Sequence, residues 1–292
     1  MFEYLSAMLW HHATGALALD RPRIVGIVNV TPDSFSDGGA LRTADDVRRH
    51  IERLVAEGAD VIDIGGESTR PQGATPVDVD EELRRVMPAI RSAVTEFPTI
   101  PVSVDTIKSR VAAEALAAGA SIVNDVSGFR LDDQMAAVCA RGGAGVVVMH
   151  SRGQVADMAT FVHAAYGEDA VGEVIAELRS SVQRALDAGV ASDRVVIDPG
   201  IGFSKRGAQS LAMLREMQRF TTLGYPVLVG VSRKRFIGEI TEAQRPADRD
   251  AGTAGANVAA LERGARLFRV HDVKMSRDAL NVAWAIMQSG PV

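Results

Sequence analysis

The residues that could do chemistry in this chain stand directly after short apolar runs. The longest such polar segment is NVTPDSFSDGG, residues 29–39, which follows the apolar run at residues 24–28. Pro32 stops a strand from continuing, and Gly38 and Gly39 permit backbone angles that other residues avoid. Because an ordinary strand-to-helix connection has about 2 to 6 residues, this long polar segment predicts a functional loop.

Polar groups also end the other apolar runs of the chain. In chain order they are Glu67 to Arg70; Asp105; Asn124 with Asp125; His150 with Arg152; Asp198; Ser232 to Lys234; and Arg269 with His271 and Asp272. One such residue would usually be a helix cap or a loop residue. Polar groups on every run favour a shared site, provided that the fold brings the runs together.

Two kinds of chemistry can be separated within this set. Fixed donors and acceptors suit a flat heterocycle with amino and oxo groups, whose buried polar edge must be fully paired. Cationic and proton-donating groups suit phosphate oxygens. The first kind is represented by Asp105, Asn124, Asp198 and Lys234, and the second by Arg70, Arg269 and His271.

Asn29 offers a hard oxygen ligand beside the phosphate-binding group, so we expect it to hold Mg²⁺ that is bound mainly by phosphates. The chain has no His/Cys spacing for zinc, no GxSxG and no Walker loop. These absences disfavour a zinc site, a hydrolase triad and a P-loop.

The apolar runs predict the elements that must position these residues. They lie at residues 24–28, 60–66, 100–105, 121–125, 145–150, 194–200, 226–234 and 266–272, and are continuous rather than alternating. Continuous runs are typical of parallel strands buried on both faces. The segments between them have helical periodicity, Thr43 is a candidate N-terminal cap, and a glycine recurs at the end of several helices. Eight strand–helix units predict a (β/α)8 TIM barrel, while the alternative, a doubly wound sheet, lacks GxGxxG after its first strand.

Composition narrows the class of protein. The 292 residues carry a net charge of −5, which does not favour nonspecific nucleic-acid binding. The single cysteine, Cys139, is expected to be buried filler, and the chain shows neither a convincing signal peptide nor a long apolar run. We therefore expect a cytoplasmic protein with no membrane partner. We read residues 1–292 as a single domain, with residues 1–23 as an extension that forms a lid or a short hairpin.

The ordered motifs resemble one known family. They are NVTPDSFSDGG, IDIGGESTRP, VSVDT, IVNDVSG, VMHSRG, DPGIGF, LVGVSRKRFIG and GARLFRVHDV, between about Ile24 and Val273. Together they resemble the dihydropteroate synthases of the folate pathway. This resemblance implies a transferase that joins 6-hydroxymethyl-7,8-dihydropterin pyrophosphate to p-aminobenzoate, giving 7,8-dihydropteroate and pyrophosphate.

The resemblance also implies roles for individual residues. The pterin would be held by Asp105, Asn124, Asp198 and Lys234, and the pyrophosphate by Asn29, Arg70, Arg269 and His271, with Mg²⁺ at Asn29. The p-aminobenzoate site would comprise Thr69, Pro71, Phe203, Lys234 and the start of the following helix. The implied catalytic set is Asp33, Asp105, Asp198 and Lys234, and residues 31–39 and 68–74 would close over the site. A homodimer built on the later barrel helices and sensitivity to sulfonamides are implied as well.

Four positions depart from the family pattern, namely Ser151, Ser204, Arg206 and Ser210, and they affect the expected fit and loop behaviour more than the reaction. Two other functions remain open at this point. A pterin-dependent methyltransferase would share the barrel and the Asp/Asn set, but would not need Lys234 together with Arg269 and His271. A paralogue could bind a pterin or a partner protein without turnover.

Overall fold

The computed structural model describes residues 8–31, 43–68 and 76–289. Four residues expected in the site, Asp33, Thr69, Arg70 and Pro71, lie outside the described residues, as do the expected closing loops apart from Thr31 and Ser68.

Eight parallel strands form the centre of the fold, as the apolar runs predict. They are β3 (Arg23–Asn29), β4 (Val61–Gly65), β5 (Val102–Asp105), β6 (Ile122–Asp125), β7 (Gly145–Met149), β8 (Val195–Asp198), β9 (Leu228–Val229) and β10 (Leu267–Val270). Their order in the sheet is β8-β7-β6-β5-β4-β3-β10-β9. A parallel bridge between Ile197 and Val227 joins the two ends of this order. The predicted (β/α)8 barrel is therefore confirmed.

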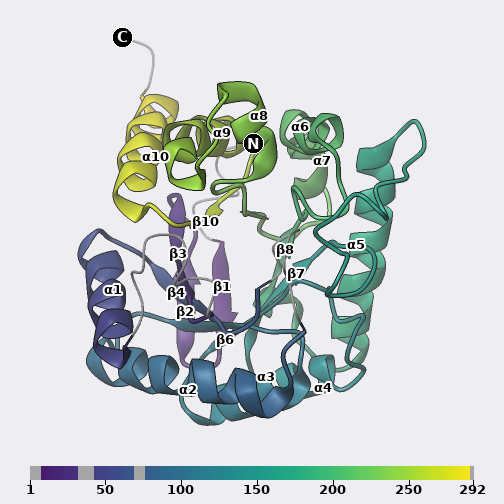
Figure 1. Ribbon diagram of the computed structural model, residues 1–292. Helices are drawn as coiled ribbons and strands as arrows, with labels where there is room; N and C mark the ends of the chain where they lie inside the picture. Colours follow the sequence, from purple (N-terminus) through teal and green to yellow (C-terminus); the bar gives the residue numbers. More distant parts are fainter. Residues whose placement is uncertain (1–7, 32–42, 69–75, 290–292) are drawn as a thin grey trace.

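Helices surround the strands (Figure 1). They are α1 (Ala44–Ala56), α2 (Val79–Glu96), α3 (Ser109–Ala117), α4 (Met135–Gly142), α5 (Ala170–Asp187), α6 (Gly207–Arg215), α7 (Gln218–Thr221), α8 (Arg235–Thr241), α9 (Asp250–Glu262) and α10 (Val273–Gln288). Thr43 caps α1 in a reciprocal capping box with Asp46, as predicted. Gly58 and Gly119 end helices with φ of 96° and 101°, which confirms the predicted left-handed helix ends.

One predicted strand is shorter than its apolar run. The run at residues 226–234 contributes only Leu228–Val229 to the ladder. Beyond it the chain turns, with Lys234 N bonded to Val231 O at 3.1 Å and Arg233 at φ 59°. The turn carries Lys234 to the start of α8, so Lys234 belongs to a strand–helix connection rather than to the strand.

The floor of the barrel is an apolar layer formed by the inward side chains at the start of the strands. It contains Val25, Val61, Ile122, Val147, Val196, Leu228 and Leu267, together with Trp10 and Leu19 from the N-terminal segment. Trp10 is 1 % exposed, and its Nε1 donates to Arg194 O at 2.9 Å. The floor therefore closes the end of the barrel at which the strands begin.

The N-terminal segment forms a hairpin of β1 (Leu9–His12) and β2 (Gly15–Ala18), which confirms one of its two expected forms. The expectation of a lid is wrong for the described residues, because the hairpin lies beneath the floor, away from the strand ends that carry the polar groups. Trp10 and Leu19 pack into the floor cluster, and Ala13 N bonds Ser121 O, just before β6, at 3.1 Å.

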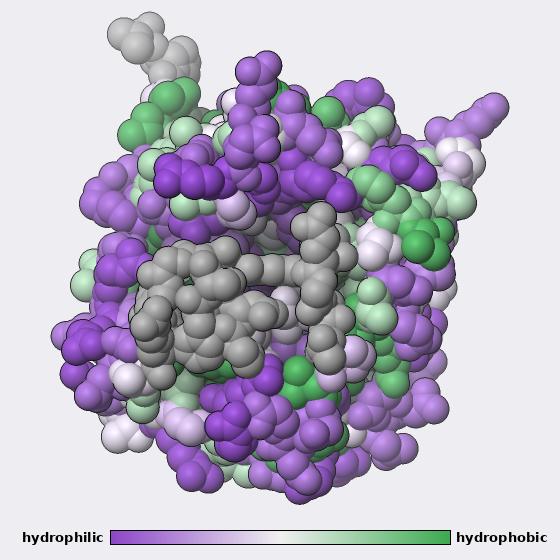
Figure 2. Space-filling view, viewed as in Figure 1, coloured by the Kyte–Doolittle hydropathy of each residue, from purple (hydrophilic) through white to green (hydrophobic). Residues whose placement is uncertain are grey.

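Hydrophilic side chains cover most of the described surface seen in Figure 2, as expected for helices that bury only an inner stripe. No helix of the described residues has the length and apolarity to cross a membrane. Cys139 is buried in α4 as predicted, and burial raises the pKa of its thiol to about 12.

Candidate active site

A layer of polar side chains lies one inward position above the apolar floor. Side chains two residues apart on a strand share one face. Asp63, Asn124, Asp198 and Arg269 therefore follow Val61, Ile122, Val196 and Leu267 into the interior of the barrel. The two-residue spacing places a floor residue and a polar residue on the same face of each of these strands, so the polar side chains meet directly above the apolar floor.

Arg269 is the centre of this layer. Its Nε donates to Asp63 Oδ2 and its Nη2 to Asp105 Oδ2, both at 2.6 Å. Asn124 Nδ2 donates to the same Asp63 oxygen at 3.1 Å. Asp105 and Asn124 are register partners on β5 and β6, so they present their side chains at the same level. One cation and two carboxylates are thus fixed by direct hydrogen bonds, with an amide beside them.

Two carboxylates of this site, those of Asp105 and Asp198, have raised pKa values. Burial raises the pKa of Asp105 to about 7; the Asp63 carboxylate adds to this shift, whereas Arg269 opposes it. Burial also raises the pKa of Asp198 to about 6, against the Gly200 N–H, which donates to Asp198 Oδ1 at 2.7 Å. Perturbed acids gathered in one pocket are typical of functional sites.

Lys234 and Phe203 belong to the segments after β9 and β8, and their side chains contact each other at the strand ends. The Lys234 ammonium lies 3.9 Å from the centroid of the Phe203 ring. Burial lowers the pKa of Lys234 to about 8, and the Asp198 carboxylate acts in the opposite direction. The neighbouring Arg233 points elsewhere and binds Asp250 on α9 with two hydrogen bonds of 2.8 Å. Arg233 therefore anchors the turn, while Lys234 is left for the pocket.

His271 and Asn29 stand at the ends of neighbouring strands. His271 follows β10, and Ser232 Oγ lies 2.9 Å from its Nδ1 and 3.1 Å from its backbone N. Asn29 is the last residue of β3, level with Gly65 of β4. Both are partly exposed at the strand ends. The structure thus places Asn29, Asp105, Asn124, Asp198, Phe203, Lys234, Arg269 and His271 around the same end of the barrel.

His150 and Arg152 do not belong to this pocket, although they were grouped with it because they follow β7. His150 is 3 % exposed and bonds Glu177 of α5 at 3.0 Å. Arg152 binds Glu173 and Glu177 and stacks 3.9 Å above the Tyr166 ring. The expectation was wrong because Glu173 and Glu177 of α5 bind these two side chains outside the barrel.

Asp63 is the residue that sequence reasoning missed. It lies inside the apolar run at residues 60–66 rather than at its end, and strand-end position was the criterion for the other residues. A signal was present, since a carboxylate in the middle of a buried strand needs a partner. In the described structure Asp63 Oδ1 is buried without a hydrogen-bond partner, so this acceptor is available to a ligand.

Comparisons with known proteins agree with this geometry. Residues 25–271 match the family described as "Pterin binding enzyme". Dihydropteroate synthase of Bacillus subtilis is 40% identical over 273 residues, which cover 94% of this chain and 91% of that protein.

Two solved structures of Xanthomonas albilineans dihydropteroate synthase superpose closely. The structure with 4-aminobenzoic acid has a TM-score of 0.89 at 45% identity, covering 98% of this chain and 100% of the other. The structure in complex with 7,8-dihydropteroate has a TM-score of 0.85 at 43% identity, covering 97% and 100%. The motifs, the polar layer and these likenesses agree: the chain belongs to the dihydropteroate synthase family of pterin-binding enzymes.

Proposed function

We propose that this protein is a dihydropteroate synthase, which joins 6-hydroxymethyl-7,8-dihydropterin pyrophosphate to p-aminobenzoate with release of pyrophosphate. The observation that carries the proposal is the layer in which Arg269 bonds both Asp63 and Asp105. This layer presents donors and acceptors above an apolar floor, as a flat heterocycle with a polar edge requires.

The pterin would lie across this layer. Asp198 and the unpaired Oδ1 of Asp63 would accept N–H groups of the amino-pyrimidine edge, and Asn124 would add a hydrogen bond. A carboxylate suits this edge because it can accept two parallel N–H bonds. Lys234, whose ammonium lies above Phe203, would donate to a ring oxygen or nitrogen.

The leaving group would lie at the strand ends beside His271 and Arg269. Nη1 of Arg269 makes no hydrogen bond among the described residues and would face a phosphate oxygen. By resemblance, Arg70 would join these two residues.

The described residues fit a Mg²⁺ ion that is bound mainly by the substrate and water rather than by the protein. No group of three or more His, Cys, Asp or Glu side chains in the described residues could hold a metal ion. The nearby carboxylate oxygens of Asp63 and Asp105 accept bonds from Arg269. Asn29 would therefore supply one oxygen ligand, and the pyrophosphate and water would supply the others. When bound, the ion would stabilise negative charge on the leaving group.

We infer a dissociative substitution. The bond between the exocyclic carbon of the pterin and the bridging oxygen breaks, and the electron pair leaves with pyrophosphate. The electron-rich pterin ring spreads the resulting positive charge, which the Asp105 and Asp198 carboxylates stabilise from fixed positions. The amine of p-aminobenzoate then forms the new C–N bond, and its surplus proton passes to water or to the released pyrophosphate. No protein nucleophile is needed for this substitution. By resemblance, Asp33 would join the catalytic residues when the first loop closes over the site.

The p-aminobenzoate ring would pack against Phe203 and the stem of Lys234, with Thr69 and Pro71 added by resemblance. Its carboxylate would lie toward the start of α8, which begins at Arg235. Sulfonamides share the aromatic amine and its para acceptor group. We therefore propose that they compete with p-aminobenzoate at this site.

The proposed function is tested by incubating the purified protein with the pterin pyrophosphate, p-aminobenzoate and Mg²⁺. We expect one dihydropteroate to form for each pyrophosphate released. Asp105→Ala should reduce turnover strongly, whereas His271→Ala should mainly weaken binding of the pyrophosphate group. Pterin binding without turnover in the wild type would instead support a binding paralogue, and wild-type turnover in Asp105→Ala would refute the pocket assignment.

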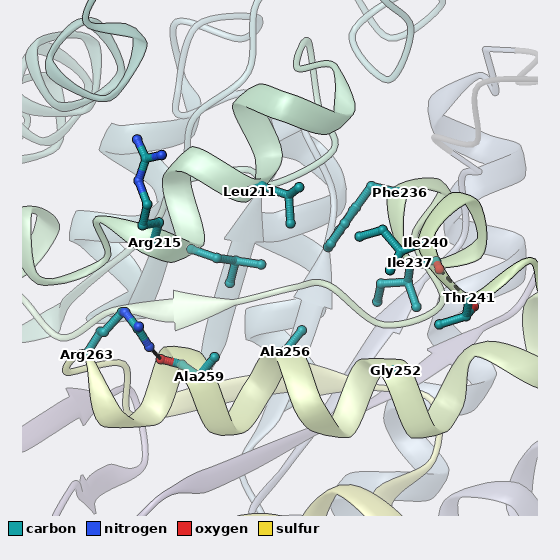
Figure 3. A pocket seen from close by; sticks show the side chains of 11 residues that line it. Leu211, Arg215, Phe236, Ile237, Ile240, Thr241, Gly252, Ala256, Ala259 and Arg263 are labelled. Atoms are coloured by element: carbon teal, nitrogen blue, oxygen red, sulfur yellow. Dashed lines mark hydrogen bonds between the residues drawn. The ribbon is translucent and has the colours of Figure 1, made fainter.

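We also propose that the protein forms a homodimer through the later barrel helices. A groove of about 310 Å³ lies between α6, α8 and α9. In Figure 3 the side chains of Leu211 and Phe236 approach from two helices above α9, where the facing residues Gly252, Ala256 and Ala259 are small. Leu211 is 44% exposed and Ile240 is 62% exposed at this groove. A second copy of the chain would cover these apolar side chains.

The dimer is tested by sedimentation of Leu211→Glu and Ile240→Glu. Both variants should sediment as monomers at concentrations where the wild type is a dimer. Val162→Glu provides the control, because Val162 is 71% exposed but does not line the groove. A monomeric wild type would contradict the proposal.

We further propose a cytoplasmic location, in which the buried thiol of Cys139 stays reduced.

A further inference from the structure

Lys205 is a buried cation that the proposed mechanism does not use. It is 1 % exposed and lies in the connection between β8 and α6. Burial lowers the pKa of its amine to about 7, while Asp198 and Glu177 act in the opposite direction. Removing an ammonium group from water is costly unless its N–H groups are satisfied, so its partners indicate what it does.

Three acceptors surround the amine of Lys205. It donates to Gly200 O at 3.1 Å and to Phe203 O at 3.0 Å, and it lies 2.8 Å from His150 Nδ1. The other imidazole nitrogen of His150 bonds Glu177. A neutral His150 that donates from Nε2 to Glu177 leaves Nδ1 as an acceptor, and burial lowers the pKa of His150 to about 4. The ammonium therefore finds a partner for each of its three protons.

The two carbonyls held by Lys205 belong to residues that position the substrate pocket. Gly200 N–H donates to Asp198 Oδ1 at 2.7 Å, so Gly200 orients the carboxylate assigned to the pterin. The Phe203 ring lies under Lys234 and forms the wall assigned to p-aminobenzoate. The Lys205 amine thus supports two residues that would contact substrate, namely Asp198 for the pterin and Phe203 for p-aminobenzoate.

The backbone of this connection needs such support. Gly200 has φ 65°, and a Cβ placed on it would clash with the backbone oxygen of His150. Ser204 is a non-glycine residue at φ 48°, in the left-handed region that costs free energy for most side chains. The connection is held in this conformation by its hydrogen bonds, of which Lys205 supplies two.

We propose that Lys205 is a positioning residue for both substrates, because it fixes the carbonyls of Gly200 and Phe203 and thereby the Asp198 carboxylate and the Phe203 ring. The inference rests on the proposed function and adds a residue that acts through others rather than by touching substrate. It predicts that loss of the amine disturbs the pterin end and the p-aminobenzoate end of the pocket together.

The test compares Lys205→Met with the wild type in steady-state kinetics. Methionine keeps the length of the apolar stem but cannot donate to either carbonyl. The KM values for both substrates should rise about tenfold and kcat should fall about tenfold or more, because misplaced catalytic groups lose rate steeply. Binding of 6-hydroxymethylpterin, measured by calorimetry, should weaken by a similar factor. Since the wild type is measured first, failure of the proposed function is recognised separately as the absence of wild-type turnover.

Arg266→Met is the matched control. Arg266 is 2 % exposed and also donates to two backbone carbonyls, those of Leu261 and Ala265, but it precedes β10 at the floor end of the barrel. It should lower the melting temperature without changing either KM by more than twofold. If Arg266→Met raises both KM values as much as Lys205→Met does, the effect is general destabilisation and the proposal fails.

Lys205→Gln covers the case in which Lys205→Met does not fold. Its amide keeps a donor but is shorter than the lysine side chain, so we expect both KM values to rise by about threefold. A folded Lys205→Met, or in its absence a folded Lys205→Gln, with both KM values within twofold of the wild type would overturn the proposal.

Discussion

Arg269 Nη2 and Asp105 Oδ2 lie 2.6 Å apart across the barrel, although 164 residues separate the two in the chain. Arg269 bonds Asp63 at the same distance, so its guanidinium group is fixed at two points. Burial lowers the pKa of Arg269, but the Asp63 and Asp105 carboxylates outweigh this effect, and the group stays cationic. The site therefore holds its charges in place within the free protein, as electrostatic preorganisation requires.

Replacing Arg269 with Lys should show that the two hydrogen bonds of the guanidinium group contribute more to activity than its charge does. A lysine keeps the charge but lacks the planar group that bonds Asp63 and Asp105 together. We expect kcat/KM for the pterin pyrophosphate to fall on the order of 10²-fold. Arg266→Lys, which lies just before β10 at the floor end of the barrel, is the control. Steady-state rates within threefold of wild type for Arg269→Lys would contradict the assignment.

The pH profile of kcat/KM for the pterin pyrophosphate should be bell-shaped. The acids must be ionised to stabilise positive charge, and their pKa values of about 7 for Asp105 and about 6 for Asp198 place the acidic limb between these values. Lys234, with a pKa of about 8, should cause the alkaline limb as it loses its proton. Lys234→Met should abolish the alkaline limb, and a limb near pH 8 that persists in this variant would point to another group.

Asp198→Asn should abolish most activity and yet stabilise the fold. The folded pKa of Asp198, about 6, is above its value of about 4 in the unfolded chain, so ionisation favours unfolding. The free-energy cost of ionising Asp198 in the folded protein is absent below about pH 4, grows between pH 4 and 6, and is constant above that. It is on the order of 2 to 3 kcal/mol. Calorimetry should therefore show a higher melting temperature at pH 8 and little change at pH 4; a lower one at pH 8 would contradict the argument.

Trp10→Ala should lower the free energy of unfolding without changing substrate binding. The indole closes the barrel floor and is almost fully buried. Truncating a buried Trp typically costs about 3 to 5 kcal/mol, so denaturant unfolding should show a loss of this size. Because the hairpin lies away from the strand ends that carry the site, both KM values at low temperature should stay unchanged. A change in KM without a loss of stability would place the hairpin nearer the site than the structure does.

The fold and much of the site follow from local patterns in the sequence. Continuous apolar runs that end in polar residues predict the strands, and barrel closure brings Asp105, Asn124, Asp198 and Arg269 together. The pairing choices do not follow from these patterns. His150 and Arg152 have the same strand-end position but turn to α5, because Glu177 outside the barrel offers them a carboxylate. Asp63 was missed because its role depends on Arg269, 206 residues further along the chain.

The central claim is tested most directly by the fate of the oxygen that bridges the pterin carbon and the diphosphate. The pterin pyrophosphate is labelled with oxygen-18 at that atom and incubated with the protein, p-aminobenzoate and Mg²⁺, and the products are analysed by mass spectrometry. Our account predicts dihydropteroate without label and pyrophosphate that carries all of it, because the C–O bond breaks. Label retained in a pterin alcohol, with no dihydropteroate formed, would show cleavage at phosphorus and contradict the account.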